Sequence, residues 1–307
     1  MWGAPGLCTR ATVIFDIYIN DLPLCLLHTS PILFADDTTI FKSSDNIDIL
    51  YQMINHDLCN LVDWFRANRL SLNTSKSYCM LFNDRTAVPT QRHITIENEI
   101  IERKNHGKFL GLVLDERLNW SHHLAYVRSK LSRSLYAMNR MKHILDTKHL
   151  TILYQSLIHS HLSYGLILWG STFATYLKPL QVCQRKSLHC IYNAAYDAHS
   201  NPFFARSNIL KLEDLWEFEL CKFVFDALHG FLPKPLSSLY MFNATVHSYI
   251  TRQSRNPHVV SIRTLIARNS PSHQGPMVWS RVPVDIRNLN NRNSFKHSLK
   301  RHFLRTY

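Results

Sequence analysis

Apolar residues recur with two different periods along this chain, and the change of period divides it. Up to about residue 115, short apolar runs alternate with helix-like stretches, whereas from Ser121 onward apolar residues recur every three or four positions. The pattern therefore predicts the fold class α+β, with an α+β region followed by an all-helical one and a boundary near residue 118.

The first region is predicted to contain a helix, a hairpin, a second helix and several short strands, in that order. Amphipathic helices are expected over residues 12–22, stopping at Pro23, and over residues 46–68. Between them, residues 32–35 and 38–41 read as two strands of a β-hairpin. Further strands are predicted at residues 78–82, 94–96, 100–101 and 109–114, with a turn over residues 97–99.

The helical region is predicted from the spacing of its apolar residues. These residues mark one helix between 121 and 145, a second over 150–158, a third over 212–228 and a short last one over 294–304. We expect three parts: residues 1–118, 119–235 and 236–307.

The charge of the chain is concentrated near one end. The whole sequence of 307 residues carries 35 Lys and Arg against 22 Asp and Glu, a net charge of +13. Residues 241–307 hold 11 of those cations and a single acid, Asp285. A polyanion such as nucleic acid is the natural partner of this basic region.

Several classes of protein are not favoured. No apolar run is long enough to span a membrane, and the first residues lack a secretory signal pattern, so we expect a soluble, intracellular protein, nuclear or cytoplasmic. The seven cysteines form no C-x-x-C pair, and the spacing of Cys183, Cys190 and His199 matches no usual zinc site. The 18 histidines include no H-E-x-x-H motif, so no zinc or other histidine metal site is expected.

Asp36 and Asp37 are the candidate metal ligands. They lie at the tip of the predicted hairpin, where a rigid turn would present two carboxylates to a divalent cation, as phosphoryl transfer requires. Two acids in a turn are also common as ordinary turn residues, so this pair alone does not decide between the two interpretations.

Motifs around this pair extend over nearly the whole chain. They are YINDLP at residues 18–23, FADDTTI at 34–40, WFRAN at 64–68, LSLNTSK at 70–76, KFLGLVLD at 108–115, LNWSHH at 118–123, HLSYG at 161–165 and GPMVW at 275–279. Taken in order, they resemble the reverse transcriptases of non-LTR (LINE-type, jockey-like) retrotransposons.

That resemblance implies a partial reverse-transcriptase palm, followed by a helical thumb and a C-terminal region. The implied activity is that of an RNA-directed DNA polymerase, a nucleotidyltransferase that uses Mg²⁺, deoxynucleoside triphosphates, an RNA template and a DNA primer. It assigns Asp36 and Asp37 to metal binding and catalysis, and Lys76 to proton transfer to the leaving pyrophosphate. It assigns Phe109, Leu110 and Gly111 to the hairpin that holds the primer.

The chain also departs from the family pattern. The resemblance implies a further metal-binding aspartate on an earlier palm strand, and Asp16 and Asp21 stand at the wrong place in the motif order to replace it. We therefore expect an N-terminally truncated fragment that binds Mg²⁺ weakly and is inactive alone, which leaves its status as an enzyme uncertain.

Basic residues are candidates for contact with the nucleic-acid backbone. These candidates are Arg128, Lys130, Arg133, Arg252, Arg281, Lys296, Lys300 and Arg301. Each of them could equally be part of an ordinary solvated surface. Two other interpretations of the chain stay open: a non-enzymatic RNA- or DNA-binding remnant, and a translated relic without a selected role. The sequence does not define an oligomeric state.

Overall fold

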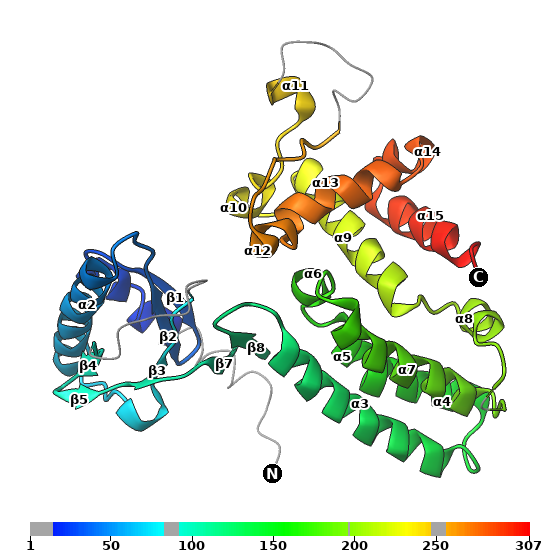
Figure 1. Cartoon of the computed structure of the whole chain (residues 1–307), viewed down its shortest axis with the longest axis horizontal. Coiled ribbons are helices and arrows are strands. Elements are labelled where there is room, and N and C mark those ends of the chain that lie inside the picture. The colour runs from blue at the N-terminus through cyan, green and yellow to red at the C-terminus, as the bar shows by residue number, and fades with distance from the viewer. Residues whose placement is uncertain (1–14, 83–91, 196, 247–255) are drawn as a thin grey trace. The chain divides into compact units, whose positions relative to one another are not determined.

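The chain folds into two compact units, Met1–Gly107 and Lys108–Tyr307, which are described separately. The computed structural model describes residues 15–82, 92–195, 197–246 and 256–307 (Figure 1). The first unit combines helices with short strands, and the second consists of helices behind one small hairpin, which confirms the predicted α+β class. In the described part of the chain, no helix combines the length and the hydrophobicity that a membrane crossing requires.

The first unit contains the predicted β-hairpin. Strand β1 (Ser30–Phe34) pairs antiparallel with β2 (Asp37–Phe41), and Phe34 lies opposite Asp37. Only two residues, Ala35 and Asp36, make the turn. Ala35 has a φ of 50°, which is in the left-handed region that two-residue hairpin turns require and that alanine adopts at a cost.

One long helix covers this region. Helix α2 (Ile47–Ala67) begins at Asn46, whose side chain accepts hydrogen bonds from two backbone N–H groups of the first turn. Its buried face contributes Leu58 and Leu61 to a core that also contains Leu22. This helix agrees with the prediction for residues 46–68.

The segment before the hairpin differs from the prediction. Residues 15–18 are helical, and residues 12–14 of the predicted helix lie outside the described residues. Pro23 does not end a helix but lies inside the 3-10 helix η1 (Leu22–Cys25), at a first-turn position where a missing N–H costs nothing.

The remaining strands of the first unit are very short. Strands β4 (Thr95–Ile96) and β5 (Glu99–Ile100) form the predicted hairpin, whose turn residues Glu97 and Asn98 both have positive φ. Strand β3 (Tyr78–Cys79) covers only the start of the predicted run. It pairs with β6 (Glu102–Arg103) in parallel, so the expectation of short antiparallel strands is wrong for this pair.

The buried carboxylate of Asp57 ties α2 to the chain just before β1. Its oxygens accept hydrogen bonds from the backbone N–H groups of Leu27, His28 and Thr29 at 2.7–3.2 Å, and from the Thr29 hydroxyl at 2.8 Å. Burial by itself raises the pKa of Asp57, but these hydrogen bonds outweigh it and lower the pKa to about 2. The entry into β1 is therefore fixed by one ionised side chain.

Strand β7 (His106–Phe109) begins in the last two residues of the first unit and forms a hairpin with β8 (Leu112–Asp115) at the start of the second unit. The predicted strand over residues 109–114 is wrong in its middle, because Leu110 and Gly111 have φ values of 44° and 83° and form a turn.

Helices form the rest of the second unit (Figure 1). They are α3 (Ser121–Met141), α4 (Thr147–Tyr154), the π-helical turn η3 (Gln155–His159), α5 (Ser160–Ser163), α6 (Leu166–Trp169), α7 (Ala174–Ile191), α8 (Asn201–Ser207), α9 (Leu212–Leu228), α10 (Lys234–Ser237), α11 (Asn243–Val246), α12 (Leu265–Arg268), α13 (Pro271–Arg281), α14 (Val284–Arg287) and α15 (Arg292–Leu304). Helix α3 packs against α7, and α13 and α15 pack against α9. Helices α3, α9 and α15 were predicted, and α4 with η3 covers the helix predicted over residues 150–158; α7 and α13 were not predicted.

Side chains of the sequence motifs join the β7–β8 hairpin to the helices. The Asp115 carboxylate accepts hydrogen bonds from three backbone N–H groups, including that of Trp120 at 2.9 Å, and so shapes the loop that enters α3. The Val113 N–H donates to Nδ1 of His123 at 3.3 Å. Burial lowers the pKa of His123 to about 4, so this imidazole is neutral and able to accept at neutral pH.

The HLSYG motif anchors the tip of the same hairpin. The hydroxyl of Tyr164 donates to the carbonyl of Leu110, and the Tyr164 carbonyl accepts from Nε1 of the fully buried Trp169 at 2.9 Å. Gly165 has a φ of 63°, and a Cβ on it would lie 2.8 Å from a methyl carbon of Leu112. The packing of the β7–β8 hairpin therefore explains these residues of the HLSYG motif without a role in catalysis.

Replacing Asp57 by asparagine is expected to destabilise the protein by about 2 kcal/mol at neutral pH, because an amide cannot accept all four hydrogen bonds. The low pKa of Asp57 gives the pH dependence: its stabilising effect is complete above about pH 4 and is lost as the pH falls towards 2. Thermal unfolding followed by circular dichroism at several pH values measures the difference from wild type. Asp63→Asn, a change of an exposed acid on the same helix, is the control and should have little effect.

Substitution of two glycines separates backbone strain from steric overlap. Gly165→Ala should cost about 2–3 kcal/mol, because it adds overlap with Leu112 to the left-handed backbone. Gly230→Ala should cost only about 1 kcal/mol, because Gly230 has a φ of 72° but no atom within 4 Å of the added Cβ. Midpoints of urea unfolding test this order, and equal effects of both changes would contradict the proposed packing against Leu112.

Candidate functional site

The candidate metal ligands Asp36 and Asp37 lie at the tip of the β1–β2 hairpin. Asp36 is the second residue of the turn, Asp37 is the first residue of β2, and both are exposed. The two-residue turn and the five-residue pairing on each side hold this tip on a regular hairpin. The structure thus places two adjacent carboxylates where a divalent cation has free access.

The described residues offer these two acids no further ligand. Among them, no third histidine, cysteine, aspartate or glutamate joins Asp36 and Asp37 in a group tight enough to hold a metal ion. A two-metal site needs carboxylates that hold two ions about 4 Å apart. Two carboxylates at one hairpin tip are fewer ligands than such a site needs.

Lys76 lies in the same unit, at the end of the 3-10 helix η2 (Thr74–Lys76). Its backbone N–H donates to the side-chain oxygen of Asn73 at 3.2 Å, and its own side chain is exposed. Burial raises the pKa of Tyr78, Lys104 opposes this effect, and the charge of Asp37 adds to it. Tyr78, two residues after Lys76, therefore lies within electrostatic reach of Asp37.

The candidate primer-holding residues belong to the second unit. Phe109 ends β7, and Leu110 and Gly111 form the turn that Tyr164 anchors. A Cβ on Gly111 would lie 3.1 Å from the Tyr164 ring, so the turn is packed tightly on this side. The structure thus places these three residues, each partly buried, at the end of a hairpin that Tyr164 anchors.

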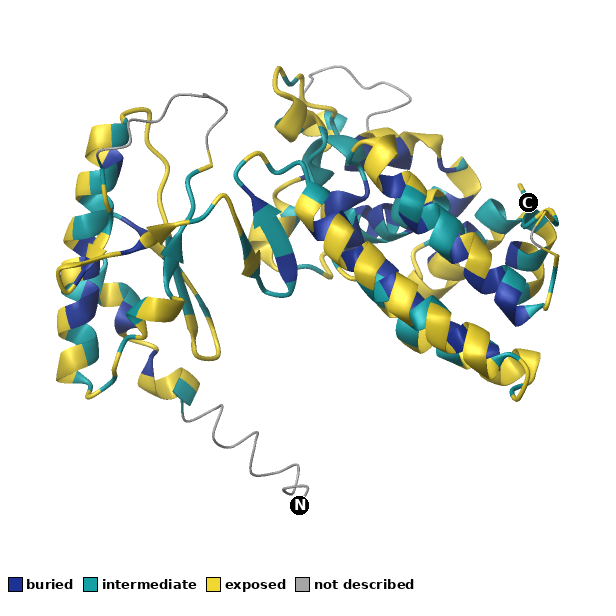
Figure 2. Cartoon of the chain, turned by 60° about the horizontal axis from the view of Figure 1, so that its bottom comes forward, coloured by how far each residue is buried: buried dark blue, intermediate teal, exposed yellow. Residues whose placement is uncertain are grey.

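Helix α3 carries the first group of candidate nucleic-acid contacts. Its sequence contains no acid, and Arg128 and Arg133 are exposed on it. The ammonium group of Lys130 lies 5.5 Å from the centre of the Tyr126 ring, and Tyr136 is 68% exposed. In Figure 2, exposed positions run along one side of α3, the long helix that follows the β7–β8 hairpin in the chain. Cations and aromatic rings on the surface of a helix are the groups that bind phosphates and stack on bases.

Two basic residues near the C-terminus, the candidate Arg281 and also Arg292, are paired inside the fold. Arg281 on α13 contacts Glu217 at 3.0 Å, and Arg292 at the start of α15 contacts Asp226 at 2.6 Å. Both acids are on α9. The charge of these arginines is therefore partly neutralised within the unit, which the composition of residues 241–307 alone does not show.

The other candidates of this region differ in exposure. Lys296 and Arg301 are exposed on α15, whereas Lys300 is partly buried. Burial, with the nearby charge of Lys296, lowers the pKa of Lys300. Arg252 lies outside the described residues. A role for any of these residues in nucleic-acid binding stays a prediction.

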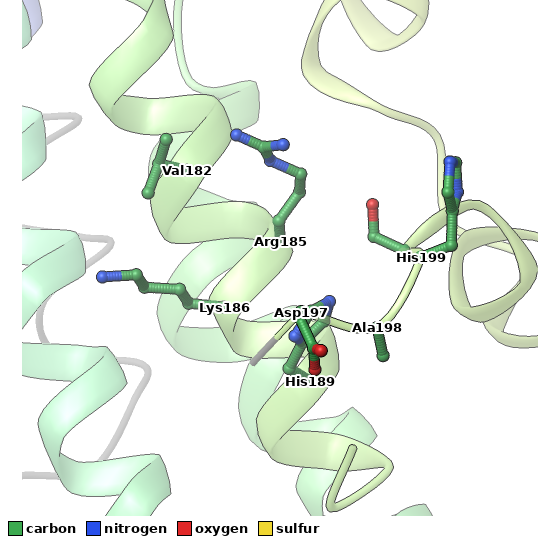
Figure 3. Close-up of a pocket in the computed structure, with 8 residues that line it drawn as sticks. Val182, Arg185, Lys186, His189, Asp197, Ala198 and His199 are labelled. Carbon is green, nitrogen blue, oxygen red and sulfur yellow. The ribbon is translucent and has the colours of Figure 1, made fainter. Parts of the chain in front are cut away.

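The structure adds a basic pocket of about 330 Å³ that the sequence analysis missed. Arg185, Lys186 and His189 of α7 line it together with Asp197, Ala198 and His199 of the segment before α8 (Figure 3). Arg185 and His189 are one helical turn apart, so this grouping becomes visible only once α7 is recognised as a helix.

Searches of known proteins find relatives among the polymerases of mobile elements. The chain is 22% identical to a probable RNA-directed DNA polymerase from transposon BS of Drosophila melanogaster, over 69% of the chain and 24% of the relative. It is 24% identical to a retrovirus-related Pol polyprotein from type-1 retrotransposable element R1 of Bradysia coprophila, over 71% of the chain and 22% of the relative. It is 21% identical to an RNA-directed DNA polymerase from mobile element jockey of Drosophila melanogaster, over 86% of the chain and 30% of the relative.

The chain spans less than a third of the length of these three relatives. No family model and no solved structure matches it. The matches confirm the resemblance inferred from the motifs: the chain is similar to the RNA-directed DNA polymerases of non-LTR retrotransposons.

Proposed function

We propose that this chain is the part of a retrotransposon reverse transcriptase that carries one side of the metal site and the grip on primer and template. The exposed Asp36–Asp37 pair at the tip of a regular hairpin is the single observation that carries this proposal. The substrates would be an RNA template, a DNA primer and deoxynucleoside triphosphates, and the reaction would take place inside the cell, in the nucleus or the cytoplasm.

Mg²⁺ is the ion that the donor type fits. Exposed carboxylate oxygens are the ligands that Mg²⁺ prefers, and a bound ion would neutralise charge on the phosphates of the substrate. The number of donors fits less well, since the described residues join no further ligand to Asp36 and Asp37. We therefore expect weak Mg²⁺ binding and no polymerase activity from the chain alone.

The other residues of the first unit have roles that follow from their placement. Lys76 would assist the leaving pyrophosphate from an exposed side chain two residues before Tyr78, which lies within electrostatic reach of Asp37. The turn of Ala35 keeps both carboxylates at the very end of the hairpin, because a longer loop would leave them free to move.

The second unit would hold the nucleic acid. Its hairpin turn, anchored through Leu110 by Tyr164, presents a rigid backbone edge to a primer end. Helix α3, which contains no acid and carries Arg128, Lys130 and Arg133, would contact phosphates of the duplex.

Metal binding at the hairpin can be tested with Mn²⁺, a paramagnetic substitute for Mg²⁺. Mn²⁺ should broaden the amide NMR signals of the hairpin turn with a dissociation constant on the order of 1 mM, because only two carboxylates bind it. The double variant Asp36→Asn, Asp37→Asn should lose this broadening, whereas Asp63→Asn should keep it. Absence of broadening at the turn of the wild-type protein would overturn the metal role of the pair.

Primer extension on an RNA template with Mg²⁺ tests the inference of inactivity. Neither the wild type nor the variant Asp36→Ala, Asp37→Ala should incorporate deoxynucleotides. Incorporation by the wild type that the double variant loses would mean that another ligand completes the site, and that the chain is an active polymerase by itself.

Nucleic-acid binding without polymerisation is the second candidate function. The acid-free helix α3 favours it, because phosphate neutralisation needs exposed cations and no metal ion. Binding accompanied by neither Mn²⁺ binding at the hairpin nor incorporation would select this function over the first.

The salt dependence of binding identifies the residues that contact phosphates. The affinity for a fluorescent primer–template duplex should fall steeply between 50 and 200 mM salt. Replacing Arg128, Lys130 and Arg133 by alanine should reduce the slope of log affinity against log salt by about 2–3, which is roughly one unit for each lost phosphate contact.

A variant with three alanines elsewhere in the second unit controls for net charge. Lys148, Lys178 and Lys234 are exposed and lie on other helices. If their replacement lowers the slope as much as the α3 variant does, the binding depends on total charge, and α3 is not the contact surface.

A further inference from the structure

A second group of potential metal ligands lies at the other end of β1 from the hairpin tip. His28 is in the segment that enters β1, and His56 and Asp57 are neighbours on α2. Their ligand atoms all lie within 4.8 Å of one another. Among the described residues, this is the one group of three or more His, Cys, Asp or Glu side chains that meets this distance.

Two of the three ligands are held in place by the fold. The Asp57 carboxylate is fully buried and accepts the backbone N–H of His28 itself at 2.8 Å, so the helix and the His28 backbone cannot separate. The two imidazole rings meet edge to face with their centres 5.2 Å apart. Nδ1 of His56 lies 3.5 Å from Oδ1 of Asp57.

One oxygen of the carboxylate keeps room for a further partner. Oδ2 receives three hydrogen bonds of 2.7–2.8 Å, whereas Oδ1 receives only the longer one of 3.2 Å from Leu27 and the approach of His56. Because a carboxylate oxygen offers two lone pairs, Oδ1 can accept an ion without losing the contacts that hold β1.

The third ligand, His56, has a side chain that can rotate towards the other two ligands. The side chain of His56 is 52% exposed, so its ring can turn towards His28 without disturbing the core. Ligand atoms that each lie about 2.0–2.2 Å from one zinc ion are closer to one another than 4.8 Å. Binding would therefore require a small rotation of the exposed His56 ring.

We propose that His28, His56 and Asp57 form a binding site for a divalent transition-metal ion of the Zn²⁺ type. Two imidazole nitrogens and one carboxylate oxygen are ligands of Zn²⁺, with a fourth position open to water, whereas Mg²⁺ prefers oxygen ligands throughout. The ion would connect α2 to the segment that enters β1, and so would stabilise the hairpin that carries Asp36 and Asp37. This inference is independent of the proposed polymerase function.

Metal titration of the full chain, stripped with a chelator, tests the site. Calorimetry with Zn²⁺ and the visible absorption of Co²⁺ should both report one site in the wild type. His28→Ala and His56→Ala should each weaken binding at least about tenfold, because each removes one of three protein ligands. His93→Ala removes an exposed histidine of the same unit and should leave binding unchanged.

Hydrogen exchange locates the effect and controls for folding. Zn²⁺ should slow amide exchange in peptides that cover residues 27–29 and the start of β1 in the wild type but not in His56→Ala. Without metal, His56→Ala should exchange like the wild type, because the Asp57 hydrogen bonds remain. Failure of the wild type to bind Zn²⁺, or binding of Zn²⁺ by His28→Ala and His56→Ala as tightly as by the wild type, would overturn the site.

Discussion

Backbone N–H groups in the connecting segments need acceptors, and this requirement organises both units. Where the chain leaves regular structure, an amide that is removed from water without an acceptor costs free energy. Asp57 supplies the acceptor for three consecutive amides before β1, and Asp115 supplies it for three amides before α3. Asn73 does the same for the turn at Lys76. One short polar side chain in each case fixes the direction of a segment that carries candidate function.

Part of the positive charge near the C-terminus is likewise paired with acidic side chains inside the fold. Helix α9 carries acids on the side where the C-terminal helices pack, and these acids bind groups from that region. Glu217 contacts Arg281, and Asp214 accepts a hydrogen bond from the Tyr307 hydroxyl at 2.6 Å. The ring of Phe295 stacks on Phe225 with centres 4.3 Å apart, so the region contributes to the core as well as to the charge. A net positive charge along the sequence therefore overstates the number of cations that are free to meet a polyanion.

The elements that the sequence predicted correctly are those formed by a regular spacing of apolar residues or by a short turn. The helices α2, α3 and α9 have regular apolar faces, and the β1–β2 hairpin has two β-prone runs around a short polar turn, so all four were found. Helices α7 and α13 contain Pro179 and Pro276, residues that usually break helices, and tertiary packing overrides this tendency here. A continuous strand was predicted over residues 109–114, and the turn within it was missed because leucine is an unusual residue at positive φ.

Of the candidate ligands, the sequence could predict only those that are neighbours in the chain. Asp36 and Asp37 are neighbours in the sequence, so the turn could be inferred from four or five residues. His28 and His56 are far apart in the sequence, and only the packing of α2 against the entry to β1 brings them together. No spacing rule detects such a pair, because the rules describe ligands on one element. The two ends of β1 thus differ in donor chemistry, oxygen alone at the tip and mainly nitrogen at the base. Ions of different softness would then occupy different ends, since Mg²⁺ competes poorly for imidazole.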